Sequence, residues 1–208
     1  MATAFRPKSG RISGRLDAEE IAILVHVLGS TRDFVAPDRQ DTGDPLVDLV
    51  AGLDSSEPAP EEPQDPALLR LLPVAHRTDA AQAEEFRALT EHSLRRRKAA
   101  NLDAAIEVLT AAGPGKIELD QQQAGGLMVA LTDVRLVLGE RLGLRTDEDS
   151  AAVHEQLRAA TSGPDDAAGS GDDDDTIPSA VQVRFQQMAY YDFLSWLQES
   201  LAVSLLES

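Results

Sequence analysis

A dense run of basic side chains is the feature of this sequence that could most directly support chemistry or binding. Four cations follow one another in the middle of a long predicted helix, and two arginines flank the apolar stripe of the next one. Clustered cations can hold phosphate groups or the acidic surface of a protein partner. The simpler interpretation is a solvated helix face, with the arginine stems lying on the core and their charged ends in water. The candidate partner-binding residues are Arg95, Arg96, Arg97, Lys98, Arg135 and Arg141.

The familiar patterns of catalytic and metal sites do not occur. No Walker loop, dinucleotide fingerprint, nucleophile elbow or zinc-binding helix can be found, and residues 113–116 resemble a phosphate loop only in composition. The absence of cysteine excludes disulfides, thiolate metal sites and thiol-based redox sensing. We therefore expect no catalytic residues, no metal, no cofactor and a protein that is not an enzyme. The dispersed histidines are His26, His76, His92 and His154.

Composition indicates one acidic domain with an unevenly distributed charge. The chain has 208 residues and a net charge of −17, which disfavours nucleic-acid binding over a broad surface. Residues 36–65 and 161–179 are rich in acids and small polar residues, and we expect them to be disordered or loosely held acidic linkers. The 42% hydrophobic content supports a core for a single helical domain over residues 1–208.

The first fifteen residues have the opposite charge. They carry Arg6, Lys8, Arg11 and Arg15 and no acid, in two short runs around Ser9–Gly10 that suit a β-hairpin or a disordered basic arm. Because Pro7 lacks an amide hydrogen, the first run should lie at the edge of any sheet. These four cations support an alternative function, a transcription factor that binds DNA through its N-terminal residues.

Residues 120–144 predict the central helix. Apolar residues at spacings of three and four draw one stripe along it, and further apolar residues lie on its other side, so neighbouring helices should wrap it. Asp120 suits the N-cap and Gly143 the C-terminus. The stripe consists of Leu127, Leu131, Val134, Leu138 and Leu142.

Further helices are predicted to surround this one. They begin at Asp17 (a capping box with Glu20), at Asp65 before Pro66, and at Asp79. In the helix over residues 79–112 the apolar stripe changes side across the basic cluster, so the helix bends there or changes packing partners. A final helix over residues 181–206 should pack against the central helix or against another copy of itself. The fold class is mainly α, a multi-helix bundle with a small N-terminal β-hairpin or arm.

Four stretches together resemble a known family. They are DPALLRLLPVAHRTD (65–79), AEEFRALTEHSLRRRKAANL (83–102), LTDVRLVLGERLGL (131–144) and YYDFLSWLQESL (190–201). The combination is similar to the actinobacterial AosR-like family of oxidative-stress transcriptional regulators, formerly a domain of unknown function and encoded near the adaptor ClpS. The resemblance implies a mostly helical fold and contact with the transcription machinery. Relatives that sense oxidants do so through an N-terminal cysteine pair, which this chain lacks.

These observations predict a regulatory protein-interaction protein that is not an enzyme. Its expected partners are proteins, among them components of the transcription machinery, and a second copy of itself in a homodimer. The alternatives are the DNA-binding function and an adaptor role in Clp proteolysis, which rests on gene neighbourhood alone. No run approaches about 18 consecutive apolar residues, so we expect no membrane partner and a cytoplasmic location.

Overall fold

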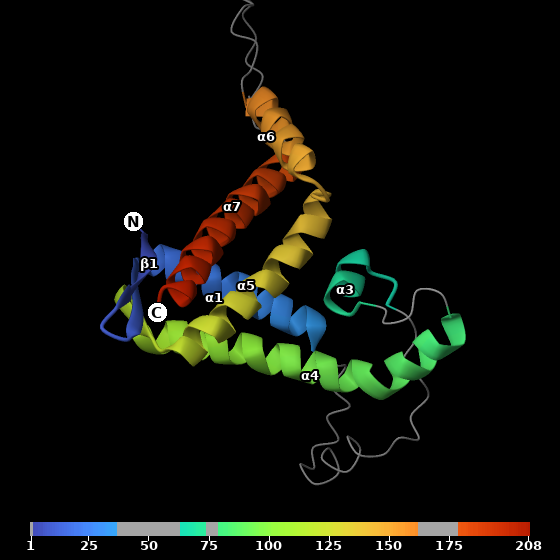
Figure 1. Ribbon diagram of the computed structural model, residues 1–208. Helices are drawn as coiled ribbons and strands as arrows, with labels where there is room; N and C mark the ends of the chain where they lie inside the picture. Colours follow the sequence, from blue (N-terminus) through green and yellow to red (C-terminus); the bar gives the residue numbers. More distant parts are fainter. Residues whose placement is uncertain (1, 37–62, 74–78, 162–178) are drawn as a thin grey trace, which may run out of the picture.

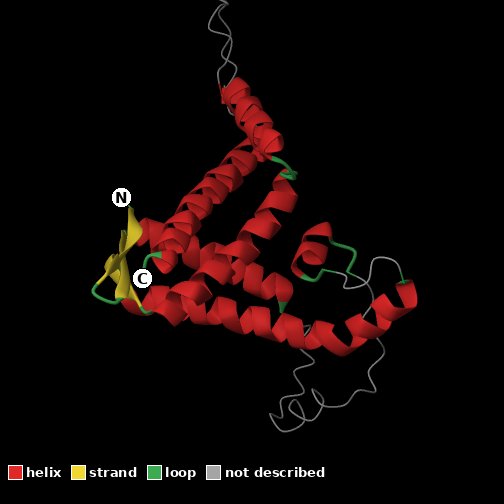
Figure 2. Ribbon diagram, viewed as in Figure 1, coloured by secondary structure: helices red, strands yellow, loops and turns green. Residues whose placement is uncertain are grey.

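The computed structural model describes residues 2–36, 63–73, 79–161 and 179–208, and it is built mainly of helices with one small sheet (Figures 1 and 2). The mainly α fold class is confirmed. The predicted linkers over residues 36–65 and 161–179 lie almost entirely outside the described residues. The elements are β1 (Thr3–Lys8), β2 (Arg11–Leu16), α1 (Ala18–Val35), α3 (Pro66–Leu71), α4 (Ala80–Ala112), β3 (Gly115–Leu119), α5 (Gln121–Leu142), α6 (Asp147–Thr161) and α7 (Ser179–Leu206).

The helices begin and end at local signals. Asp17 accepts a hydrogen bond from the Glu20 amide while the Glu20 side chain accepts one from the Asp17 amide, which completes the predicted capping box of α1. Asp120 makes the same reciprocal arrangement with Gln123 at the start of α5. At the other end of α5, Gly143 adopts a left-handed conformation with φ of 77°, which ends the helix at little cost because glycine has no Cβ.

The N-terminal hairpin is part of a larger sheet than the sequence suggested. The strands β1, β2 and β3 lie side by side in that order, and both pairs are antiparallel. The third strand was not predicted; it comes from the segment between α4 and α5, about a hundred residues after the hairpin. As predicted, the strand with Pro7 lies at an edge. Figure 2 shows the sheet covering one end of the helical bundle.

One face of the sheet joins the core. Ile12, Leu16 and Ile117 are fully buried, and Phe5 lies over the backbone of Gly14. A Cβ added to Gly14 would lie only 2.8 Å from a ring carbon of Phe5, so this close approach requires glycine. The opposite face of the sheet is therefore left to the polar and basic residues that alternate with these.

Helix α5 is the centre of the molecule, as predicted, but its second apolar side is only partly covered, because Val129 and Leu136 are 49% and 38% exposed. It contacts α1, α3, α4, α7 and the sheet. Leu127, Leu131 and Val134 are buried within the main core cluster, and Gly126 lies against Asn101 of α4, whose side chain donates to its carbonyl oxygen at 3.1 Å. A second, smaller cluster joins the C-terminal end of α5 to α6 and α7 around Leu142 and Met188.

The apolar stripe of α4 changes side where the helix leaves the part that packs against α1 and α5. Leu102 and Leu109 are fully buried, in the part of the helix that packs against α1 and α5. Phe86 and Leu89, in the first part, are 46% and 72% exposed. Figure 1 shows these N-terminal turns of α4 extending past the end of α1, and α3 lies beside them in the part of the chain that the structure describes.

Candidate interaction surfaces

The basic cluster in α4 does not form one surface, because two of its members point inward. The guanidinium of Arg95 contacts Oε1 of Glu91 at 2.7 and 2.8 Å, and the Glu91 side chain is almost fully buried. Lys98 Nζ lies 2.6 Å from Oδ1 of Asp133, a buried carboxylate on α5. Arg95 and Lys98 therefore stabilise the fold through these ion pairs and do not contribute to a partner surface.

The other two members of the cluster remain at the surface. Arg96 and Arg97 are exposed on the outer side of α4. Two exposed arginines on one helix turn are typical of a solvated face, which was the simpler interpretation of this cluster. The cluster thus contributes half of its predicted charge to any partner surface.

Arg135 joins α5 to α7. Its guanidinium donates to Oε1 of Gln198 at 2.7 Å and to the hydroxyl of Tyr191 at 3.3 Å, and it lies 5.1 Å from the centre of the Tyr191 ring. Gln198 in turn donates to the hydroxyl of Thr132 at 2.8 Å. This polar network fixes the two helices side by side, so the structure gives Arg135 a positioning role between helices.

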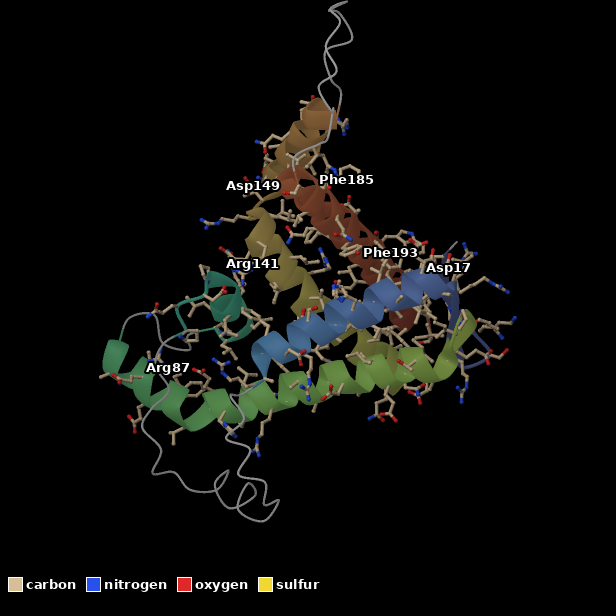
Figure 3. The ribbon with its side chains drawn as sticks, turned by 180° about the vertical axis from the view of Figure 1, so that it is seen from behind. Asp17, Arg87, Arg141, Asp149, Phe185 and Phe193 are labelled. Atoms are coloured by element: carbon tan, nitrogen blue, oxygen red, sulfur yellow. The ribbon has the colours of Figure 1, made fainter. Side chains whose placement is uncertain are left out.

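Arg141 joins three elements at the other side of α5 (Figure 3). Its guanidinium donates to Oδ2 of Asp65 at 2.5 Å and lies 5.5 Å from the centre of the Phe34 ring in α1. Asp65 is also the N-cap of α3, accepting from the amide of Ala67 at 2.9 Å. The hydrogen bond from Arg141 is the main reason why the pKa of Asp65 lies below its ordinary value.

Arg141→Gln should therefore make a small, pH-dependent difference to stability. A carboxyl group with a lowered pKa stabilises the fold above its unfolded-state pKa of about 3.9, and this contribution disappears as the pH falls through its lower folded-state value. Because the pair is partly exposed, we expect a loss of about 1 kcal/mol or less at neutral pH. Urea unfolding at neutral pH and near pH 3 measures this difference, which should shrink at the lower pH. Arg96→Gln, on an exposed and solvated face, should show no such pH dependence.

The N-terminal cations gather on the outer face of the sheet. Arg6 lies opposite Ser13, Lys8 opposite Arg11, and Arg15 next to Lys116 of β3. Directly paired residues share a face, so these side chains project on the side away from the core. We call this surface the basic sheet face; its residues are Arg6, Lys8, Arg11, Arg15 and Lys116.

A shallow hollow of about 560 Å³ lies on this face. The grouping of the four N-terminal cations was predicted from the sequence. The addition of Lys116 was not, because β3 was not predicted. One acid shares the face, Glu118, which pairs with Lys116. The hydrogen bond from Lys116, followed by the nearby charges of Arg11 and Lys8, lowers the pKa of Glu118, so its carboxylate lies within the field of the face.

The outer side of α7 carries a further group of candidate residues, which are apolar. Its apolar residues divide into two groups: Leu197 and Leu201 are buried, whereas Phe185, Trp196 and Val203 are 54%, 38% and 48% exposed. Figure 3 shows Phe185 near the N-terminal end of the helix, where α6 joins it. The prediction that α7 packs against the central helix is confirmed. The sequence could not show how much of the apolar face this contact leaves uncovered.

Other kinds of site are not seen among the described residues. No group of three or more metal-binding side chains occurs in the parts of the chain that the structure describes. No helix within the described ranges is long and apolar enough to cross a membrane. His26 is exposed on α1, and His154 lies 3.4 Å from Asp192 between α6 and α7.

Comparison with known proteins assigns a family. The model of the family described as Domain of unknown function (DUF2017) matches residues 2–205, which covers the sheet and the described helices except the last residue of α7. No curated protein and no solved structure matches the chain. The chain therefore belongs to the DUF2017 family.

Proposed function

We propose that this protein is a non-enzymatic regulator that acts by binding another protein, and that the outer side of α7 is its docking surface. The observation that carries the proposal is the alignment of Phe185, Trp196 and Val203. Their spacings of eleven and seven residues bring all three to one side of a helix. Large apolar side chains exposed along one side of a helix are typical of protein-binding surfaces.

The middle of this row is held in place by its neighbours. The ring of Trp196 stacks with that of Phe193, at 6.2 Å between ring centres, and Phe193 packs against the main core. A tryptophan fixed in this way loses little side-chain entropy when a partner covers it. Rigid aromatic residues of this kind supply much of the binding energy in protein interfaces.

The charges beside the row favour a different protein over a second copy of this one. Asp192 and Glu199 are exposed and lie on the same side of α7 as Trp196. In a twofold-symmetric dimer centred on this side, the same acids of both copies would meet. A partner with an apolar groove bordered by basic residues would pair with them.

The resemblance to AosR-like proteins suggests that this partner is the transcription machinery. Such a role implies a cytoplasmic location. Because the chain contains no cysteine, its regulation cannot rest on thiol oxidation within the chain. The proposed activity is therefore binding to a transcription complex, controlled by something other than a thiol switch in this protein.

Interferometry with RNA polymerase purified from the source organism tests this proposal. We expect the wild-type protein to bind and the variant Phe185→Ser/Val203→Ser to bind about tenfold or more weakly, because both residues lie in the proposed contact. Val129→Ser is the matched control, since Val129 is 49% exposed on α5 and outside the row.

Three results would contradict the proposal. One is equal binding by the double variant and the wild type. Another is an equal loss of binding in the Val129→Ser control. The third is a wild-type dimer, measured by light scattering, that the double variant dissociates, because a second copy would then occupy this surface.

A further inference from the structure

We propose that the basic sheet face is a second binding site, which takes an acidic polypeptide segment of another protein. This site is distinct from the outer side of α7 and does not depend on the function proposed above. It places five basic residues and one acidic residue on a three-stranded surface, in a chain whose net charge is −17. Such a local reversal of charge would attract a negatively charged partner.

Four of the five cations on this face are free to bind, and the fifth, Lys116, pairs with Glu118. Arg6, Lys8, Arg11 and Arg15 are all exposed, and none of them forms an ion pair with any residue in the described ranges. By contrast, Arg95 and Lys98 neutralise buried carboxylates. The charge of the sheet face therefore has no internal use that would account for its concentration there.

The spacing of the cations suits an extended polypeptide. Adjacent strands lie about 4.8 Å apart, and residues two apart in a strand are separated by about 6.7 Å. An extended segment with an acid at every second position repeats its carboxylates at the same interval. Laid along the strands over the hollow, it would place successive carboxylates beside Lys8 or Arg11, then Arg6, then Arg15.

The segment should bind across the face and not by adding a strand at the β1 edge. Pro7 has no amide hydrogen to offer there. The amide of Phe5 already donates to Oγ of Ser200 in α7, at 3.2 Å. Because these two positions cannot donate to an added strand, the acidic segment would be recognised by the side chains of the basic sheet face.

The face fits an acidic polypeptide better than a nucleic acid. None of the described side chains that line the hollow is aromatic, so single-stranded bases would have no ring to stack on there. The cations are also confined to a short patch: Asp17 follows β2 directly and Asp120 follows β3 directly. A duplex carries about one charge per 1.7 Å and would extend over these acids, whereas a short peptide would not.

Fluorescence anisotropy of the full chain with a labelled peptide of alternating Asp and Ser tests the proposal. The wild-type protein should bind this peptide, and binding should weaken as salt is raised. Arg6→Gln/Arg15→Gln should reduce the affinity about tenfold, because two charge contacts are lost. The matched control is Arg96→Gln/Arg97→Gln, which removes the same charge from α4 and should change the affinity less than about twofold. Circular-dichroism melting checks that both variants stay folded.

Four results would overturn the proposal. They are no binding of the peptide by the wild-type protein, equal weakening by the two double variants, equal binding of a peptide of alternating Lys and Ser, and tighter binding of a twelve-base-pair duplex than of the acidic peptide. If Arg6→Gln/Arg15→Gln loses peptide binding but still binds RNA polymerase, this result would support two separate surfaces. The Phe185→Ser/Val203→Ser variant should bind the acidic peptide as the wild type does.

Discussion

Lys98→Met should lower the free energy of unfolding by about 3–5 kcal/mol, because it removes the partner of a buried carboxylate. Asp133 is 3% exposed, and Lys98 Nζ lies 2.6 Å from its Oδ1. Its other oxygen accepts no hydrogen bond from the residues that the structure describes. Without the lysine, a buried carboxylate is left without a charged partner, which is costly. For a chain of this size the melting temperature should fall by about 10 °C.

A double-mutant cycle separates the loss of the pair from the loss of the lysine stem. Lys98→Met/Asp133→Leu removes both charges and should recover most of the lost stability, because an apolar pair of similar size can replace a buried ion pair. Arg97→Met changes the neighbouring exposed residue and should have an effect within about 0.5 kcal/mol. If Lys98→Met proved as mild as Arg97→Met, the buried pair would not be important to the fold. Urea unfolding of the wild type, Lys98→Met, Asp133→Leu, the double variant and Arg97→Met provides the measurement.

Leu131→Ala should cost about 2–5 kcal/mol, because it opens a cavity at the centre of the molecule. Leu131 is fully buried in the middle of α5, among side chains from the surrounding helices. The removed methyl groups lose their contacts, and a close-packed interior relaxes only in part.

Val129→Ala, two residues away on the same helix, is the control. Val129 is 49% exposed, so its truncation should change stability by about 0.5 kcal/mol or less. Denaturant unfolding of both variants gives the two free energies. Similar values for the two variants would show that α5 is not the central helix of the fold.

The parts of the fold that could be predicted from sequence depend on local chemistry. The N-caps at Asp17, Asp65, Asp79 and Asp120 are all present, because each aspartate satisfies amides within three residues of itself. The central position of α5 was also predictable, since its main apolar stripe needs neighbours, although Val129 and Leu136 on its other side are exposed.

What the sequence could not show depends on contacts between distant segments. β3 has only five residues, and nothing local marks it as the partner of β2, about a hundred residues earlier. The inward direction of Lys98 depends on Asp133, which belongs to another helix. For the same reason, the sequence suggested that the basic cluster Arg95–Lys98 forms one surface, although two of its side chains point inward in the fold.

The edge contact between Phe5 and Ser200 has a consequence for the newly made chain on the ribosome. The two residues are 195 positions apart, so the first strand emerges long before the helix that closes its edge. At about 5–20 residues per second, the delay is on the order of 10–40 s. Throughout that time the nascent hairpin has an open edge, and Pro7, which cannot donate a ladder hydrogen bond, is the built-in protection against pairing with a neighbouring chain.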